Sequence, residues 1–131
     1  MPGSGRAFVL PEGNATRKKR GYALSKGERL RIERFRKGVD QHVAAAALGV
    51  SREHYQVLEK AADDVRRMAL YPHEWCRILR TRARVSQRVL AEKLGLTRNW
   101  VNRMECGLEH CDTLLEYWEN HDRTRIDRRN T

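Results

Sequence analysis

The stretch SQRVLAEKLGLTRNWVNRMECG, residues 86–107, places two short helical patterns on either side of a glycine. Leu90 and Leu94 before the glycine, and Val101 and Met104 after it, stand four and three residues apart, the spacing of one face of a helix. Gly95 predicts that the first helix ends in a left-handed backbone conformation, which residues with a side chain adopt only at a cost. The stretch therefore predicts two short helices joined by a tight turn.

The same pattern occurs 46 residues earlier, where residues 40–61 read DQHVAAAALGVSREHYQVLEKA. Aligning residues 23–61 with residues 69–107 gives 15 identical pairs in 39 positions, far more than chance supplies. The central glycines, Gly49 and Gly95, form one of these pairs. We conclude that the chain contains an internal duplication.

Helical patterns fill nearly all of the chain between its polar ends, so we expect an all-α fold of two tandem helix-turn-helix units. The first unit is expected at residues 22–70 and the second at residues 71–120. Because Ala61 replaces the glycine that ends the matching helix, we expect that helix to run on into the next one. The expected helices are Ser25–Lys37, Gln41–Leu48, Arg52–Ala61, one around Asp63–Leu70, Pro72–Ala83, Gln87–Leu94, Arg98–Cys106 and Asp112–Asn120.

The expected core is apolar and repeats between the units. Ala45 and Ala91 stand where two helices would cross closely, and larger side chains there would push the helices apart. The remaining inward positions are Ala44, Leu48, Val50, Tyr55 and Leu58 in the first unit, and Leu90, Leu94, Leu96, Val101 and Met104 in the second.

Both ends of the chain are polar and basic. Residues 1–21 are rich in Gly, Pro and small polar residues, and predict a flexible arm. The arm ends in a basic cluster that either binds a polyanion, as an arm in the minor groove or along the phosphates of DNA would, or only adds solubilising charge: Arg17, Lys18, Lys19 and Arg20. Residues 121–131 predict a short basic tail that frays.

The charge balance favours a polyanionic partner. The chain has 27 Lys and Arg against 17 Asp and Glu, a net charge of +10. Nucleic acid is the first candidate and an anionic membrane surface the second, but no helical pattern pairs a broad apolar face with a basic one. No apolar run approaches the roughly 20 residues of a membrane span, and no signal peptide follows Met1, so we expect a cytoplasmic protein without a membrane partner.

The cysteine and histidine residues do not indicate a catalytic or metal site. Three cysteines, Cys76, Cys106 and Cys111, suit reduced thiols better than a disulfide framework. Cys106 and Cys111 with His110 and His121 fit no standard zinc spacing. No nucleophile has the partners that catalysis requires. We therefore expect no enzyme activity, no metal and no cofactor.

Residues 85–107, V-S-Q-x-x-L-A-E-K-L-G-L-T-R-x-x-V-x-R-M-E-x-G, resemble the Cro/C1-type (lambda-repressor-like, XRE-type) helix-turn-helix DNA-binding family. The usual family form is L-S-Q-x-x-L-A-x-x-x-G-V-S-x-x-x-I-S-x-x-E-x-G. Residues 74–107 match closely. Residues 28–61 match more loosely, and depart at Asp40, Ala44 and Ala61. The family's usual fifth helix has no counterpart in either copy.

The resemblance implies the role of several residues. A structural ion pair would join Arg80 to Glu105, and Arg34 to Glu59. The third helix of a unit would enter the major groove while the second crosses the phosphate backbone. The implied base-reading residues are Arg98, Asn99, Asn102 and Arg103 in the second unit, and Arg52 and Gln56 in the first. The implied backbone contacts are Gln87, Gln41, Thr97 and Trp100.

Some positions keep two interpretations. Trp100 either lies against the DNA backbone or a thymine methyl, or is covered by the neighbouring unit. Val43 and Val89 indicate either a shared interface or ordinary half-buried helix positions. In the first unit Glu53 would repel phosphate unless it faces a cytosine amine, and Val57 lacks the charge of Arg103.

The function that we expect from the sequence is sequence-specific binding of double-stranded DNA by a transcriptional regulator. We expect a repressor of prokaryotic or phage type, associated with the nucleoid. It would act either as a homodimer or as a monomer whose two units form a pseudo-dimer. The alternative is a protein-interaction module, such as an antitoxin or anti-activator, that binds a protein partner through the acidic, tyrosine-bearing face Glu53–Glu59 of the first unit.

Overall fold

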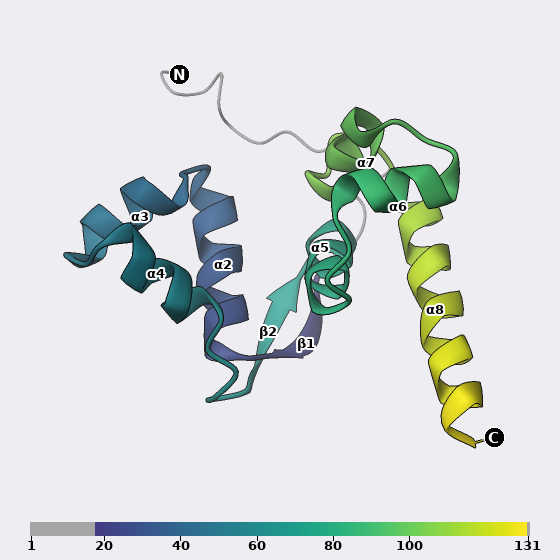
Figure 1. Cartoon of the computed structure of the whole chain (residues 1–131), viewed down its shortest axis with the longest axis horizontal. Helices are drawn as coiled ribbons and strands as arrows, with labels where there is room; N and C mark the ends of the chain where they lie inside the picture. The colour runs from purple at the N-terminus through teal and green to yellow at the C-terminus, as the bar shows by residue number, and fades with distance from the viewer. Residues whose placement is uncertain (1–17, 131) are drawn as a thin grey trace. The chain divides into compact units, whose positions relative to one another are not determined.

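The computed structural model describes residues 18–130, and the side chains of residues 18–121. Within that range the chain is mostly helical, with one small antiparallel sheet of two strands (Figure 1). It divides into two compact units: the first spans Arg20–Leu70, and the second contains Tyr71 and the helices after it. The elements are β1 (Arg20–Leu24), α2 (Lys26–Lys37), α3 (Gln41–Leu48), α4 (Arg52–Glu59), β2 (Arg66–Leu70), α5 (Pro72–Arg82), α6 (Gln87–Leu94), α7 (Arg98–Glu105) and α8 (Asp112–Asn130).

The first unit packs α4 against both α2 and α3. A reciprocal cap fixes the start of α2: the Ser25 hydroxyl accepts from the backbone N–H of Glu28, and the Glu28 carboxylate accepts from that of Ser25. The α3 helix ends at Leu48 and is capped by Gly49, whose φ of 73° is the left-handed conformation that the sequence predicted. Ala45, at the crossing of α3 and α4, is buried as expected.

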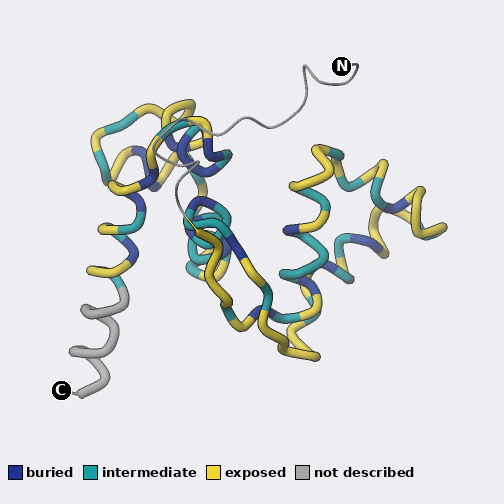
Figure 2. The backbone as a smooth tube through the Cα atoms, turned by 180° about the vertical axis from the view of Figure 1, so that it is seen from behind, coloured by how far each residue is buried: buried dark blue, intermediate teal, exposed yellow. Residues whose placement is uncertain are grey.

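The second unit repeats this three-helix group as α5, α6 and α7, and adds α8. Gly95 has a φ of 69°, matching its counterpart in the first unit. The α8 helix packs against α5 and supplies Leu114 and Trp118 to a buried cluster. Figure 2 shows buried positions recurring along the described part of α8. The cluster also contains Cys76, Leu90, Ala91, Val101, Met104 and Cys111.

The sheet corrects the sequence prediction at two places. Residues 66–70, expected within a helix, form β2, and Arg20 and Gly21, expected in the arm, belong to β1. Tyr22 pairs with Met68 at the centre of the ladder, and Leu24 pairs with Arg66. Each strand has only five residues, and its partner is remote in the sequence, so local periodicity carried no signal for either strand.

The register of the ladder follows the duplication. Tyr22 and Met68, its central pair, are 46 residues apart, the offset of the repeat. At one end Arg20 pairs with Leu70, and at the other Arg66 pairs with Leu24. The ladder therefore maps onto itself when the two copies are exchanged, as two identical antiparallel strands would pair.

The end of α4 also differs from the prediction, because the helix stops at Glu59 rather than running on. The carbonyls of Ala61 and Asp63 accept hydrogen bonds of 3.0 and 2.9 Å from the first N–H groups of α2, those of Gly27 and Lys26. These bonds satisfy the amino end of α2 and hold residues 61–63 out of helical geometry.

Two further differences concern helix length and burial. The α8 helix runs to Asn130, ten residues beyond the predicted end at Asn120. Leu48, predicted in the core, is 54% exposed. Its counterpart Leu94 packs against the cluster that contains residues of α8, and no such helix follows α4. The missing cover explains the exposure of Leu48.

Candidate nucleic-acid interface

The α7 helix presents a polar and cationic face to solvent. Its cap is Thr97, whose hydroxyl accepts from the backbone N–H of Trp100 at 3.1 Å. Arg98, Asn99 and Asn102 are exposed, and the spacings of three and four residues place them on one side of the helix. Arg98 and Asn99 have no ion pair or side-chain hydrogen bond within residues 18–121. They are therefore available to a ligand.

Arg103, the fourth predicted base-reading residue of α7, is engaged differently. Its guanidinium pairs with the Glu109 carboxylate at 2.9 Å, just beyond the end of the helix. That pair would have to open before Arg103 could reach a base. Glu109 lies outside the helical pattern that suggested the site, which is why the sequence did not reveal this contact.

The implied ion pair is present in the second unit. Arg80 Nε donates to Glu105 Oε2 at 2.7 Å, and the carboxylate is fully buried. The same guanidinium donates from NH1 to the Val85 carbonyl at 3.0 Å, in the loop before α6. One arginine therefore ties α5 and the following loop to the end of α7. Arg77 lies on the other carboxylate oxygen at 3.9 Å, a second cation that the sequence signalled only through its identity with Arg31.

The pair recurs in the first unit with the same connections. Arg34 Nε donates to Glu59 Oε2 at 2.6 Å, and NH1 of the same side chain donates to the Val39 carbonyl. Burial alone would raise the pKa of Glu59. Hydrogen bonds from Arg34 and Gln41 outweigh that effect, so the pKa lies below its ordinary value. Glu59 is thus held as a buried, paired carboxylate.

Tyr55 is an interior residue, as its predicted place among the inward positions requires, and it is not part of the exposed face that a protein-interaction module would use. Its side chain is 1% exposed, and burial, together with a hydrogen bond to Glu59, raises its pKa to about 12. Glu59 itself is 2% exposed. The two residues that best supported an acidic, tyrosine-bearing protein-binding face are therefore interior residues.

The residues expected to hold phosphate are linked to the ion pairs. The Gln87 amide donates to Glu105 Oε1 at 3.0 Å and to Asn102 Oδ1 at 3.1 Å. The Gln41 amide donates to Glu59 Oε1 at 3.0 Å and accepts from Gln56 Nε2 at 3.1 Å. Sequence reasoning missed these links, although the paired identity of Gln41 and Gln87 pointed to a shared role.

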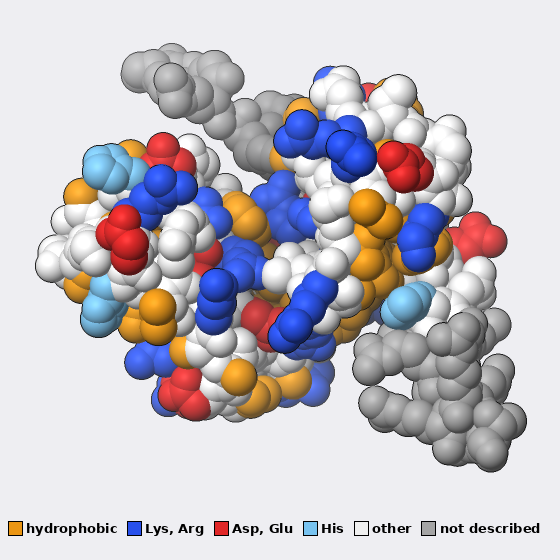
Figure 3. Space-filling model, in the orientation of Figure 1, with side chains coloured by type: hydrophobic (Ala, Val, Ile, Leu, Met, Phe, Trp, Pro, Cys, Tyr) orange, Lys and Arg blue, Asp and Glu red, His pale blue; other side chains and the backbone are white. Residues whose placement is uncertain are grey.

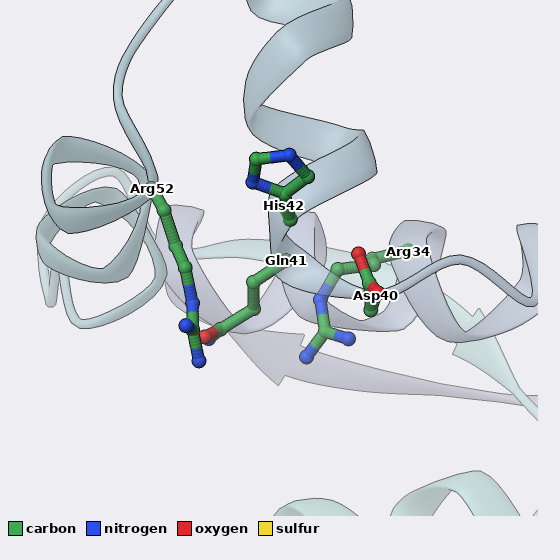
Figure 4. Close-up of a pocket in the computed structure, with 5 residues that line it drawn as sticks. All are labelled: Arg34, Asp40, Gln41, His42 and Arg52. Atoms are coloured by element: carbon green, nitrogen blue, oxygen red, sulfur yellow. The ribbon is translucent and has the colours of Figure 1, made fainter.

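A shallow pocket of about 370 Å³ opens at the start of α3. It is lined by Arg34, Asp40, Gln41, His42 and Arg52. Figure 4 shows the side chains of Arg34 and Arg52 reaching to the same side of the start of α3, on either side of Gln41. Arg52 is exposed and has no ion pair within the described residues. The predicted base-reading Arg52 and backbone-contacting Gln41 thus lie beside one pocket.

Lys18 and Lys19, from the predicted basic cluster, are exposed, whereas Arg17 lies outside the described residues. Lys19 Nζ lies 5.1 Å from the centre of the Tyr71 ring, close enough for a cation–π contact. Arg20 is exposed but lies in β1. The rest of the predicted arm also lies outside the described residues.

Several large apolar side chains are exposed near the predicted interface. Val43 and Val89, at matching positions of α3 and α6, are 50% and 40% exposed. Trp100 is 42% exposed, so no part of the described chain covers it completely. Figure 3 shows Lys and Arg side chains over both units, with acidic and apolar side chains among them.

Comparisons with known proteins identify no relative. No protein-family model matches the chain. Searches among curated proteins and among solved structures give no match either. None of the helices among the described residues has the length and apolar character of a membrane span. Within the same residues, no three His, Cys, Asp or Glu side chains gather in a way that could hold a metal ion.

Proposed function

We propose that this protein is a helix-turn-helix regulator of transcription that binds double-stranded DNA, with α7 of the second unit in the major groove. The observation that carries the proposal is the exposed set Arg98, Asn99 and Asn102 on a helix whose end is tied down by the buried Glu105. Arginine and asparagine are the side chains that bind guanine and adenine edges through paired hydrogen bonds. A rigid support fixes where those groups meet a base.

Charge and local structure add support. The net charge of +10 favours association with a phosphate backbone. Both α3–α4 and α6–α7 are pairs of eight-residue helices joined through a left-handed glycine, as in the Cro/C1-type family that the sequence resembles. We propose repression by occupancy of a site.

The first unit would take part as a second reading module. Arg52 and Gln56 occupy the α4 positions that match Arg98 and Asn102. The β1–β2 ladder has the register that two identical strands would form, and both strands lie in one chain. This supports a chain that acts as its own pseudo-dimer, with two different modules and therefore an asymmetric site.

The test is selection of bound fragments from a random duplex library by the full chain, followed by the stoichiometry on the selected sequence. One asymmetric site that holds one chain supports the pseudo-dimer. A symmetric site that holds two chains supports a homodimer in which α7 of each chain reads the DNA. Equal recovery of all sequences would overturn sequence-specific binding.

A second candidate function is a protein-interaction module, such as an antitoxin or anti-activator, and exposed apolar residues on the first unit favour it. Val43, Leu48 and Val57 are 50%, 54% and 67% exposed, and a protein partner that covered them would remove apolar surface from water. Weak salt dependence of DNA binding would favour this candidate, because phosphate contacts make binding steeply salt-dependent.

A further inference from the structure

The Glu105 carboxylate determines how the Gln87 side chain is turned. Its two oxygens accept from Arg80 and from Gln87, and Arg77 lies nearby. A carboxylate that is paired with a guanidinium group accepts hydrogen bonds and does not donate them. Gln87 must therefore direct its NH2 group, and not its carbonyl, toward Glu105. The orientation of this amide follows from the chemistry of its neighbour.

Gln87 passes that constraint to the exposed face of α7. The second N–H of the same NH2 group meets Asn102 Oδ1 at 3.1 Å. A donor requires an acceptor, so the carbonyl oxygen of Asn102 turns inward, where the Cys106 thiol also approaches it at 3.8 Å. The NH2 group of Asn102 is left with no partner within the described residues, on an exposed side chain.

The first unit has the same relay but ends in the opposite polarity. Gln41 again directs its NH2 group to the buried carboxylate, that of Glu59. Here, however, its carbonyl oxygen accepts from Gln56 Nε2 at 3.1 Å. Gln56 therefore turns its NH2 group inward, and keeps its carbonyl oxygen and one N–H for a ligand.

We propose that these two relays select different bases, with Gln87 and Gln41 as positioning residues and Asn102 and Gln56 as the groups that touch DNA. This inference rests on the proposed function. Asn102 offers only donors, which fit the N7 and O6 acceptors of guanine. Gln56 offers an acceptor and a donor, which fit the N6 amine and N7 of adenine.

The relay also changes the role expected of Gln87. A phosphate oxygen only accepts hydrogen bonds, and both N–H groups of the Gln87 side chain already donate within the protein. A phosphate beside α6 would meet the backbone N–H groups at the start of the helix instead. Gln87 therefore affects which base is preferred. A residue that held a phosphate would instead affect binding to all sequences equally.

The first measurement needs no DNA: hydrogen exchange of the side-chain amides of the full chain by NMR. Both Gln87 side-chain protons should exchange at least about tenfold more slowly than those of the exposed Asn99, because each is held by an acceptor. Equal exchange rates for Gln87 and Asn99 would overturn the relay and leave DNA binding untouched.

The second measurement compares base preferences in the library selection. Gln87→Met removes the amide, so the preference of the α7 site for guanine over adenine should fall by about tenfold while the salt slope stays the same. Gln41→Met is the matched control and should change only the adenine position. A uniform loss of affinity for all sequences, with a flatter salt slope, would overturn the proposal and indicate that Gln87 holds a phosphate instead.

A third variant leaves the supporting residues in place. Asn102→Asp replaces the outward donors by an acceptor, so the preferred base at that pair should change from guanine to cytosine, whose N4 amine donates. An unchanged preference would overturn the role of Asn102. If the unaltered chain selects no sequence, both the proposed function and the proposed base preference are wrong. Fast hydrogen exchange of the Gln87 side chain is a different result, because it overturns only the relay.

Discussion

The two units share one three-helix plan but differ in what covers it. In the second unit α8 closes the core, and Leu114 and Trp118 are buried against α5 to α7. In the first unit the chain passes from α4 into β2, and Leu48 stays exposed. The duplicated residues preserve the ion pair and the turn. The parts outside the duplication decide how much apolar surface remains open.

Removing the closing side chain of α8 gives the largest effect that we expect. Trp118→Ala should lower the free energy of unfolding by about 4 kcal/mol, because a buried indole leaves a cavity. Guanidinium denaturation followed by circular dichroism measures this. Leu48→Ala, at an exposed position of the first unit, should change it by less than about 0.5 kcal/mol.

Trp118→Phe sharpens the comparison further. The indole Nε1 is buried without a hydrogen-bond partner in the described chain, so losing it removes an unsatisfied donor. The loss should stay below about 1.5 kcal/mol, since most of the ring volume is kept. Equal losses for Trp118→Ala and Leu48→Ala would show that α8 does not close the core.

Variants that break the two ion pairs test a feature that the units have in common. Glu59→Gln should cost about 3 kcal/mol of unfolding free energy, because it leaves the largely buried Arg34 without its counterion. Glu105→Gln should cost a similar amount in the second unit. A loss confined to one variant would show that the duplicated pair supports only one of the two folds.

The pH dependence of stability tests the ion pair of the first unit in a second way. The folded-state pKa of Glu59 is lowered, so its stabilising effect is complete above the unfolded value of about 4.5 and is lost as the pH falls through the folded value. Glu59→Gln should therefore flatten the acid limb of stability against pH below about 4.5. An acid limb as steep as in the unaltered chain would contradict it.

The sequence predicted the helices that carry the candidate site well, because each has local signals at both ends. The bounds of α3 and α6 follow from a polar cap, Asp40 or Ser86, and a terminating glycine. The strands were not predicted because pairing between residues 42 to 50 positions apart has no local signal. The relays were not predicted either. Periodicity assigns Gln87 and Asn102 to helices, but it does not show that their side chains are in contact.

Under the proposed function, the reading helices should differ in how much each contributes to binding. Arg98→Ala should lose about 2 kcal/mol on the selected site and relax preference at one base pair. Arg52→Ala should lose less, because Glu53 and Val57 replace Asn99 and Arg103 on its helix. Titration on selected and random duplexes measures both, and equal loss of Arg98→Ala on both duplexes would rule out base reading by that side chain.

The smallest expected effect, that of Glu53→Gln, tests whether α4 lies close to the DNA. Glu53 is exposed in the first turn of α4, where its charge favours the helix but would repel phosphate. Glu53→Gln should tighten duplex binding at low salt by on the order of threefold. Glu33→Gln is the matched control, an exposed glutamate on α2 of the same unit. A gain only for Glu53→Gln places phosphate beside α4, because net charge alone would act equally through both variants. Equal gains would reduce the effect to net charge, and no gain would assign the first unit to assembly or to a protein partner.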